Sequence, residues 1–293
     1  MAKTTGKTIR IYLADGKPSG LLITEIMGWT GRVYQIPRTL LPSLAKNEDL
    51  EKTGIYILSG PSEANPNKEK VYIGEGDNLF KRLAQHEKNE KKDFWNKAIA
   101  VISKDENLTK AHVRYLESRL VEVASKAKRA EVGNSNSPRP KALPKPDVDY
   151  MESFLEQVLL ILPILGLSFA KPTPGSQETQ PDSPTFEYNS VGTHATAQEI
   201  DGEFVVFKGS TARKQGTASW KSYKSLRDQL VKEKKLIDLS KEYYQFSENV
   251  GFASPSAAAA VVYAGNQNGR KKWKLKGTRK TYKQWQEELL EQL

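Results

Sequence analysis

Residues 54–76 read GIYILSGPSEANPNKEKVYIGEG and contain two short apolar segments, 54–58 and 70–74, separated by a polar loop. Side chains in a β-strand alternate between the two faces of the sheet. We therefore expect Tyr56 to lie opposite its two isoleucine neighbours, and Tyr72 opposite its two β-branched neighbours. A phenol can hold a water or a phosphate oxygen. The alternative is a core tyrosine whose hydroxyl is satisfied within the fold.

The next segment predicts a helix that carries two polar groups at the border of its apolar stripe. Asp77-Asn78 offers an N-cap, and the helix should run to about residue 87. Arg82 and His86 are spaced i,i+4 and therefore share one surface of that helix. The planar guanidinium suits phosphate. The alternative is an arginine that reaches solvent and a hydrogen-bonded histidine.

A carboxylate stands in the apolar stripe of the longest helical pattern, residues 109–131. Glu117 falls among Val113, Leu120 and Val121 on the helical wheel. Burying such a charge is costly unless it is paired or binds a metal. A single carboxylate suits Mg²⁺ or Mn²⁺, and the alternative is an internal ion pair with Arg82.

Together these positions match a known pattern, because residues 54–136 resemble the GIY-YIG nuclease superfamily. The two tripeptides are 54–56 and 72–74. The resemblance implies a small antiparallel sheet flanked by helices and hydrolysis of DNA phosphodiester bonds. The positions that match the family's catalytic residues are Tyr56, Tyr72, Arg82, His86, Glu117 and, of two nearby asparagines, Asn134.

The resemblance also implies a role for each side chain. Glu117 would hold Mg²⁺ or Mn²⁺, and Arg82 would stabilise charge on the phosphate. Tyr56 would position or deprotonate the attacking water, helped by His86 or Tyr72. Gly74 is expected to lie against the nucleic acid.

Two features depart from the family pattern. Glu75 stands where the DNA-repair branch of the family carries a lysine. This difference favours the branches that carry a histidine at the position of His86. The loop at residues 59–69 is also longer than usual, which affects access of the substrate.

Length and composition divide the chain and limit its function. The 293 residues predict an N-terminal β-rich region (1–50), a nuclease domain with a helical extension (51–170), a proline-rich linker (171–185) and an accessory domain (186–293). The absence of cysteine excludes disulfide scaffolds and thiolate metal sites. The net charge of +10 favours polyanions as partners.

The accessory domain is the more basic part, with +6 against +5 for residues 1–170. It resembles an uncharacterised domain of the DUF4357 type that accompanies some bacterial GIY-YIG proteins and, more weakly, the RAMA domain of restriction and modification enzymes. We expect a hairpin at Asp201-Gly202 and a helix over residues 220–236.

One stretch of this domain, from Asn249 to Gln284, contains no acidic residue. Basic side chains neutralise phosphates, and aromatic rings stack on bases or pack the core. The residues that we expect to contact DNA are Arg270, Lys271, Lys272, Trp273 and Lys274. The alternative is a solvated strand face with core aromatics.

The sequence thus predicts an α+β protein that is a metal-dependent DNA endonuclease. By analogy with restriction enzymes, its biological role would be restriction or host defence against phage. The alternatives are a structure-specific DNA-processing nuclease and a catalytically silent scaffold that binds nucleic acid. The longest apolar stretch, residues 158–167, is broken by Pro163 and too short to span a bilayer. We expect a cytoplasmic protein without membrane association, and the sequence is compatible with a homo-oligomer.

Overall fold

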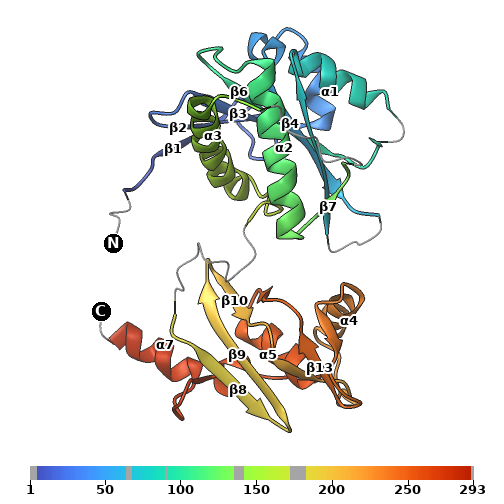
Figure 1. Ribbon diagram of the computed structural model, residues 1–293, viewed down its shortest axis with the longest axis vertical. Coiled ribbons are helices and arrows are strands. Elements are labelled where there is room, and N and C mark those ends of the chain that lie inside the picture. The colour runs from blue at the N-terminus through green and yellow to red at the C-terminus, as the bar shows by residue number, and fades with distance from the viewer. Residues whose placement is uncertain (1–4, 64–67, 90–91, 135–141, 172–182, 292–293) are drawn as a thin grey trace. The chain divides into compact units, whose positions relative to one another are not determined.

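The computed structural model describes residues 5–63, 68–89, 92–134, 142–171 and 183–291 (Figure 1). The chain forms two compact units, Met1–Pro172 and Thr173–Leu293, which we call the N-terminal and C-terminal units. Each combines antiparallel strands with helices, so the predicted α+β class is confirmed.

The N-terminal unit is built on a seven-stranded sheet with the order β1-β2-β3-β6-β4-β5-β7. All neighbours are antiparallel except β5 and β7. The strands are β1 Ile9–Leu13, β2 Leu22–Ile26, β3 Gly31–Pro37, β4 Gly54–Pro61, β5 Glu69–Gly76, β6 Lys97–Ser103 and β7 Glu131–Val132. Residues 1–50, which we expected as a β-rich region of their own, supply three strands to this same sheet, because β3 pairs along its whole length with β6.

Alternation along the strands sorts the side chains into two cores, one on each face of the sheet. Ile55 and Ile57 pack on the face covered by helices α2 (Lys110–Ala127) and α3 (Lys145–Ile164). Figure 1 shows these two helices on one side of the sheet. Tyr56 and its β4 neighbours on the opposite face pack under α1 (Leu79–Glu87) and the 3₁₀ helices η1 (Arg38–Leu44) and η2 (Glu48–Glu51). The two tyrosine-bearing strands are therefore central to both cores.

The C-terminal unit contains two sheets, with the orders β14-β10-β9-β8-β15 and β11-β13-β12. Its strands are β8 Phe186–Ser190, β9 Thr193–Ile200, β10 Glu203–Val206, β11 Thr211–Arg213, β12 Leu236–Asp238, β13 Tyr243–Phe246, β14 Val250–Phe252 and β15 Lys274–Leu275. Its helices are α4 Lys224–Lys232, α5 Pro255–Tyr263, α6 Gly269–Lys272 and α7 Tyr282–Glu291. The alanine-rich α5 is buried on nearly all sides, as its apolar composition requires.

Backbone conformation determines where one hairpin turns and where two helices end, and both helices are shorter than expected. Asp201 and Gly202 both have positive φ and join β9 to β10, as the hairpin prediction requires. The helix expected to reach residue 131 ends at Ala127, because Lys128 adopts the left-handed conformation. The helix expected over 220–236 is shortened to α4, since Tyr223 at its start and Lys234 after its end both have positive φ.

Within the described ranges, no helix combines the length and the apolar character that a bilayer crossing demands.

Candidate functional site

The two tyrosines of the site lie on one face of β4 and β5, together with a histidine from α1. The centroid of the His86 ring is 5.3 Å from that of Tyr56 and 5.3 Å from that of Tyr72. The Tyr56 hydroxyl is 2.7 Å from Nε2 of His86, within hydrogen-bonding distance. We call these three side chains the aromatic cluster. The structure thus brings together two strand residues and one helix residue.

Burial fixes the protonation of the cluster. Tyr56 is fully buried, and loss of solvation raises the pKa of its phenol well above the ordinary value. Burial, with the cations of Lys92 and Arg82 nearby, lowers the pKa of His86 to about 4. At neutral pH the phenol therefore keeps its proton and the imidazole is uncharged. With the ring proton on Nδ1, the Tyr56 hydroxyl donates to Nε2.

Glycine is required where the cluster packs most tightly. Tyr56 and Gly74 are directly opposed in the β4–β5 ladder. A Cβ on Gly74 would lie 2.3 Å from the Tyr56 hydroxyl oxygen, and a Cβ on Gly76 would lie 2.5 Å from Cγ of Arg82. Gly74, expected to contact nucleic acid, is itself buried and makes room for the phenol.

Arg82 extends from α1 beside this edge of the sheet. Its guanidinium donates to the side chain of Gln85 at 2.8 Å and forms no ion pair with a described carboxylate. It borders a pocket of about 330 Å³ whose lining is formed by Glu75, Gly76, Asp77, Asn78, Lys81, Arg82 and Lys110. A half-buried arginine at the border of a pocket lined by charged and polar residues is suited to bind an oxyanion.

Glu117 reaches the same edge from α2, on the other face of the sheet. Its carboxylate is half-buried and has no hydrogen bond or ion pair to any described residue, so the internal pair with Arg82 does not form. Burial, followed by the negative charge of Glu75, raises the pKa of Glu117 to about 7. Both effects would be relieved by a bound cation, which favours ionisation of the carboxylate.

The donor set fits a hard divalent cation held mainly by solvent and substrate. No group of three or more His, Cys, Asp or Glu side chains is gathered within the described ranges. Mg²⁺ commonly uses one or two carboxylates, with waters and phosphate oxygens completing its octahedron. Glu117 can serve as such a ligand, and its free carboxylate meets that chemistry.

Glu75 is a member of the site that the sequence pointed to only as a departure from the family pattern. Its carboxylate is 2.7 Å from Nζ of Lys110 and 3.6 Å from Nε of Arg114. Lys110, Arg114 and Glu117 follow an i, i+4, i+7 spacing, which places them on one face of α2. That spacing in the sequence indicates a charged helix face, and the structure directs this face at β5.

Asn134 lies at the edge of β5 rather than within the aromatic cluster. Its side-chain amide accepts from the backbone N–H of Ile73 at 3.1 Å and donates to the carbonyl of Ile73 at 2.8 Å. It continues with a side chain the parallel pairing that β7 makes with Lys70 and Val71. Among the described residues, the edge of β5 is open beyond this point, and there Glu117 and Arg82 approach from opposite faces.

In the C-terminal unit the basic stretch divides into exposed and buried members. Arg270, Lys271, Lys272 and Lys274 are exposed and form no ion pair with the described residues. Trp273, expected among the residues that contact DNA, is instead fully buried. Its indole N–H donates to the carbonyl of Pro255, and its ring packs against Tyr188 and Phe204. It has no free face for stacking on a base, so the core alternative is correct for this residue.

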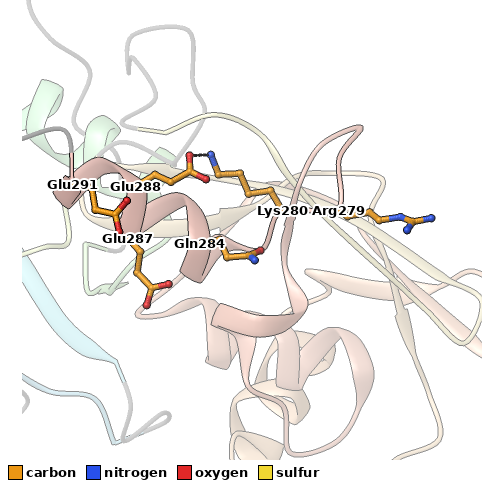
Figure 2. A pocket seen from close by; sticks show the side chains of 6 residues that line it. All are labelled: Arg279, Lys280, Gln284, Glu287, Glu288 and Glu291. Atoms are coloured by element: carbon orange, nitrogen blue, oxygen red, sulfur yellow. Dashed lines mark hydrogen bonds and ion pairs between the residues drawn. The ribbon is translucent and has the colours of Figure 1, made fainter.

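The basic side chains nearest α7 are neutralised within the unit. Lys280 pairs with Glu288, and Lys283 is 3.3 Å from Glu287. Figure 2 shows Lys280 directed at Glu288 while Arg279 extends away from the glutamates of α7. The pocket in that view carries three glutamates, so it does not suit a phosphate, and the free cations lie before Lys280 in the chain.

Comparison with known families identifies one part of the chain. Residues 186–286 match the model of a family described as Domain of unknown function (DUF4357), and the C-terminal unit therefore contains such a domain. No curated protein and no solved structure matches the chain. The resemblance of residues 54–136 to GIY-YIG nucleases stays a prediction.

The low pKa of His86 predicts that this side chain lowers the stability of the N-terminal unit in acid, while the raised pKa of Glu117 acts in the opposite direction. The folded value of about 4 lies below 6.5, so the folded state binds fewer protons than the unfolded state between these values. This stability is complete above pH 6.5 and is lost as the pH falls towards 4, by about 3 kcal/mol at most. Hydrogen exchange of the β4 and β5 amides at pH 7 and 4.5 measures it. His86→Gln should remove the loss due to His86, so that acidification lowers its stability less than that of the wild type, and His194→Gln, in the C-terminal unit, should behave as the wild type; equal slopes for all three proteins would contradict the assignment.

The burial of Trp273 predicts a role in stability. Trp273→Ala should lower the free energy of unfolding of the C-terminal unit by about 3–5 kcal/mol, because it empties the core beside Tyr188 and Phe204. The exposed neighbour supplies the control, since Lys272→Ala should change it by less than about 0.5 kcal/mol. Denaturant titration measures both, and a Trp273→Ala protein as stable as wild type would show that the ring is not a core residue.

Proposed function

We propose that the protein is a metal-dependent endonuclease that hydrolyses DNA phosphodiester bonds. The observation that carries the proposal is the approach of Arg82 and Glu117 to β5 beside the aromatic cluster, where neither side chain forms an ion pair with the described residues. The resemblance of residues 54–136 to GIY-YIG nucleases supports the same conclusion from the sequence.

The side chains would divide the reaction between them. Arg82 would bind a non-bridging oxygen of the scissile phosphate and stabilise the charge that develops there. Glu117 would hold Mg²⁺ or Mn²⁺, which supplies further stabilisation of that charge and of the departing oxygen. As the bond from water to phosphorus forms, the bond from phosphorus to the leaving oxygen breaks; the proton that the water loses would pass to solvent, and the leaving oxygen would take up a proton from solvent.

Exposure separates the roles of the two tyrosines. Tyr72 is only partly buried and its hydroxyl forms no hydrogen bond to the described residues, so it is available to orient the attacking water. Tyr56 and His86 are covered from solvent. A histidine with a pKa of about 4 is a weak base, which favours a positioning role: it holds the Tyr56 phenol, and both rings support Tyr72.

The C-terminal unit would hold DNA by charge alone. Its exposed cations, which form no ion pair with the described residues, suit phosphates, and the buried Trp273 among them offers no ring for base stacking. Contacts of this kind give affinity without sequence readout. Restriction or phage defence stays a setting proposed by analogy, and a structure-specific nuclease uses the same chemistry.

Removal of the Glu117 charge should abolish cutting and spare the fold. Glu117→Gln should lower the rate of plasmid nicking in Mg²⁺ by about 100-fold or more, because the cation loses its protein ligand. Calorimetric titration of Mn²⁺ should show weaker binding, while the melting temperature should not fall, since the variant removes a buried charge without a partner.

Glu122→Gln, on the same helix but in surface ion pairs with Arg119 and Lys126, is the matched control and should cut at the wild-type rate. Wild-type protein that cuts no form of DNA in Mg²⁺ or Mn²⁺ would overturn the nuclease, and DNA binding without cutting would favour the silent scaffold.

Charge removal from the C-terminal unit should act on the salt dependence of DNA binding. Neutralising Lys271, Lys272 and Lys274 together should reduce the slope of log K against log salt by roughly 2–3, because each phosphate that a lysine neutralises contributes about 0.9 to that slope. The control neutralises Lys280 and Lys283, which already pair with glutamates and should change the slope much less. Fluorescence anisotropy across a salt series measures both, and equal slopes would show that the exposed cations do not contact DNA.

A further inference from the structure

A second cation stands at the aromatic cluster, on the loop that follows α1. The ammonium of Lys92 lies 3.2 Å from the centroid of the Tyr72 ring. Its positive charge acts on His86, as does that of Arg82 from the preceding turn of α1. The cluster is therefore flanked by two cations, of which the resemblance to nucleases assigns only Arg82.

Lys92 lacks the carboxylate partner that neutralises other lysines of this unit. Lys110, for example, lies between Glu75 and Asp77, at 2.7 and 3.1 Å. Lys92 contacts the face of Tyr72 instead, and in the part of the chain that the structure describes it forms no ion pair. A half-buried ammonium that is held by an aromatic ring keeps its charge available to an anion.

One arginine contacts described residues on both sides of Lys92. The guanidinium of Arg38 binds Glu87 at the end of α1 at 2.8 Å, the Asp93 carboxylate at 2.6 Å and the carbonyl of Trp95 at 3.2 Å. The backbone N–H of Lys92 donates to the carbonyl of Asn89 at 2.9 Å. These contacts hold the backbone near Lys92, and the ring of Tyr72 is the contact of its ammonium.

The Tyr72 hydroxyl forms no hydrogen bond to the described residues, and the ammonium of Lys92 covers the face of its ring. We propose that Lys92 binds a backbone phosphate of the DNA next to the phosphate bound by Arg82. This inference rests on the proposed function and adds a substrate-binding residue to it. A lysine acts as a point charge and reads no base, so the contact fixes the path of the strand past Tyr72.

The test uses the non-cutting Glu117→Gln protein, so that binding is measured apart from cleavage. Lys92→Gln in that background should weaken binding of a 20-base-pair duplex and reduce the slope of log K against log salt by about 0.9, the value for one phosphate contact. Lys88→Gln is the matched control, because Lys88 is an exposed lysine at the end of the same helix. Its slope should change by much less.

Two controls distinguish phosphate binding by Lys92 from a purely structural role. Lys92→Arg should restore the slope, and the melting temperatures of Lys92→Gln and Lys88→Gln should not differ. Equal slopes for these two variants would overturn the inference while leaving a DNA-cutting wild type intact. If the wild type binds DNA without cutting it, the nuclease proposal fails and the slope still decides the role of Lys92. A wild type that binds no DNA overturns both.

Discussion

The cross-strand pair of Tyr56 and Gly74 is the constraint on which the site depends. The absence of a side chain on Gly74 leaves the volume that the phenol occupies, and the phenol in turn reaches His86 on α1. That hydrogen bond joins the buried Leu79 and Leu83 in holding α1 over the sheet, with Arg82 one turn before His86. A larger residue at position 74 would displace the ring, and the cation would move with the helix.

The assignment of strand side chains to the two faces, predicted from alternation, is correct, because the alternation follows from the need to bury apolar side chains on each face. Ile55, Ile57 and Tyr56 sort onto opposite faces, and each face is buried under its own helices. Positions governed by distant contacts could not be read in this way. The period of a strand does not show that the Asn134 amide would bind the backbone of Ile73, nor does it show that Lys92 would lie on Tyr72.

Local composition gives a wrong expectation for a side chain whose burial depends on residues distant in the sequence. Trp273 stands among lysines, which favours an exposed ring, but the ring is enclosed by aromatic neighbours from distant strands and its N–H finds the Pro255 carbonyl. Helix ends were also hidden from the sequence. Lys128 and Tyr223 adopt positive φ without being glycine, and no residue type signals that choice.

The end of β5, which no strand among the described residues covers, also bears on how copies of the protein behave in solution. An uncovered strand edge offers hydrogen-bonding groups to any other chain and is a common start of aggregation. Here the edge carries Glu75, whose carboxylate is fixed by Lys110 and Arg114, while β7 and Asn134 cover the part before it. A strand from a second copy would have to displace those charges to pair with β5, which disfavours association through this edge.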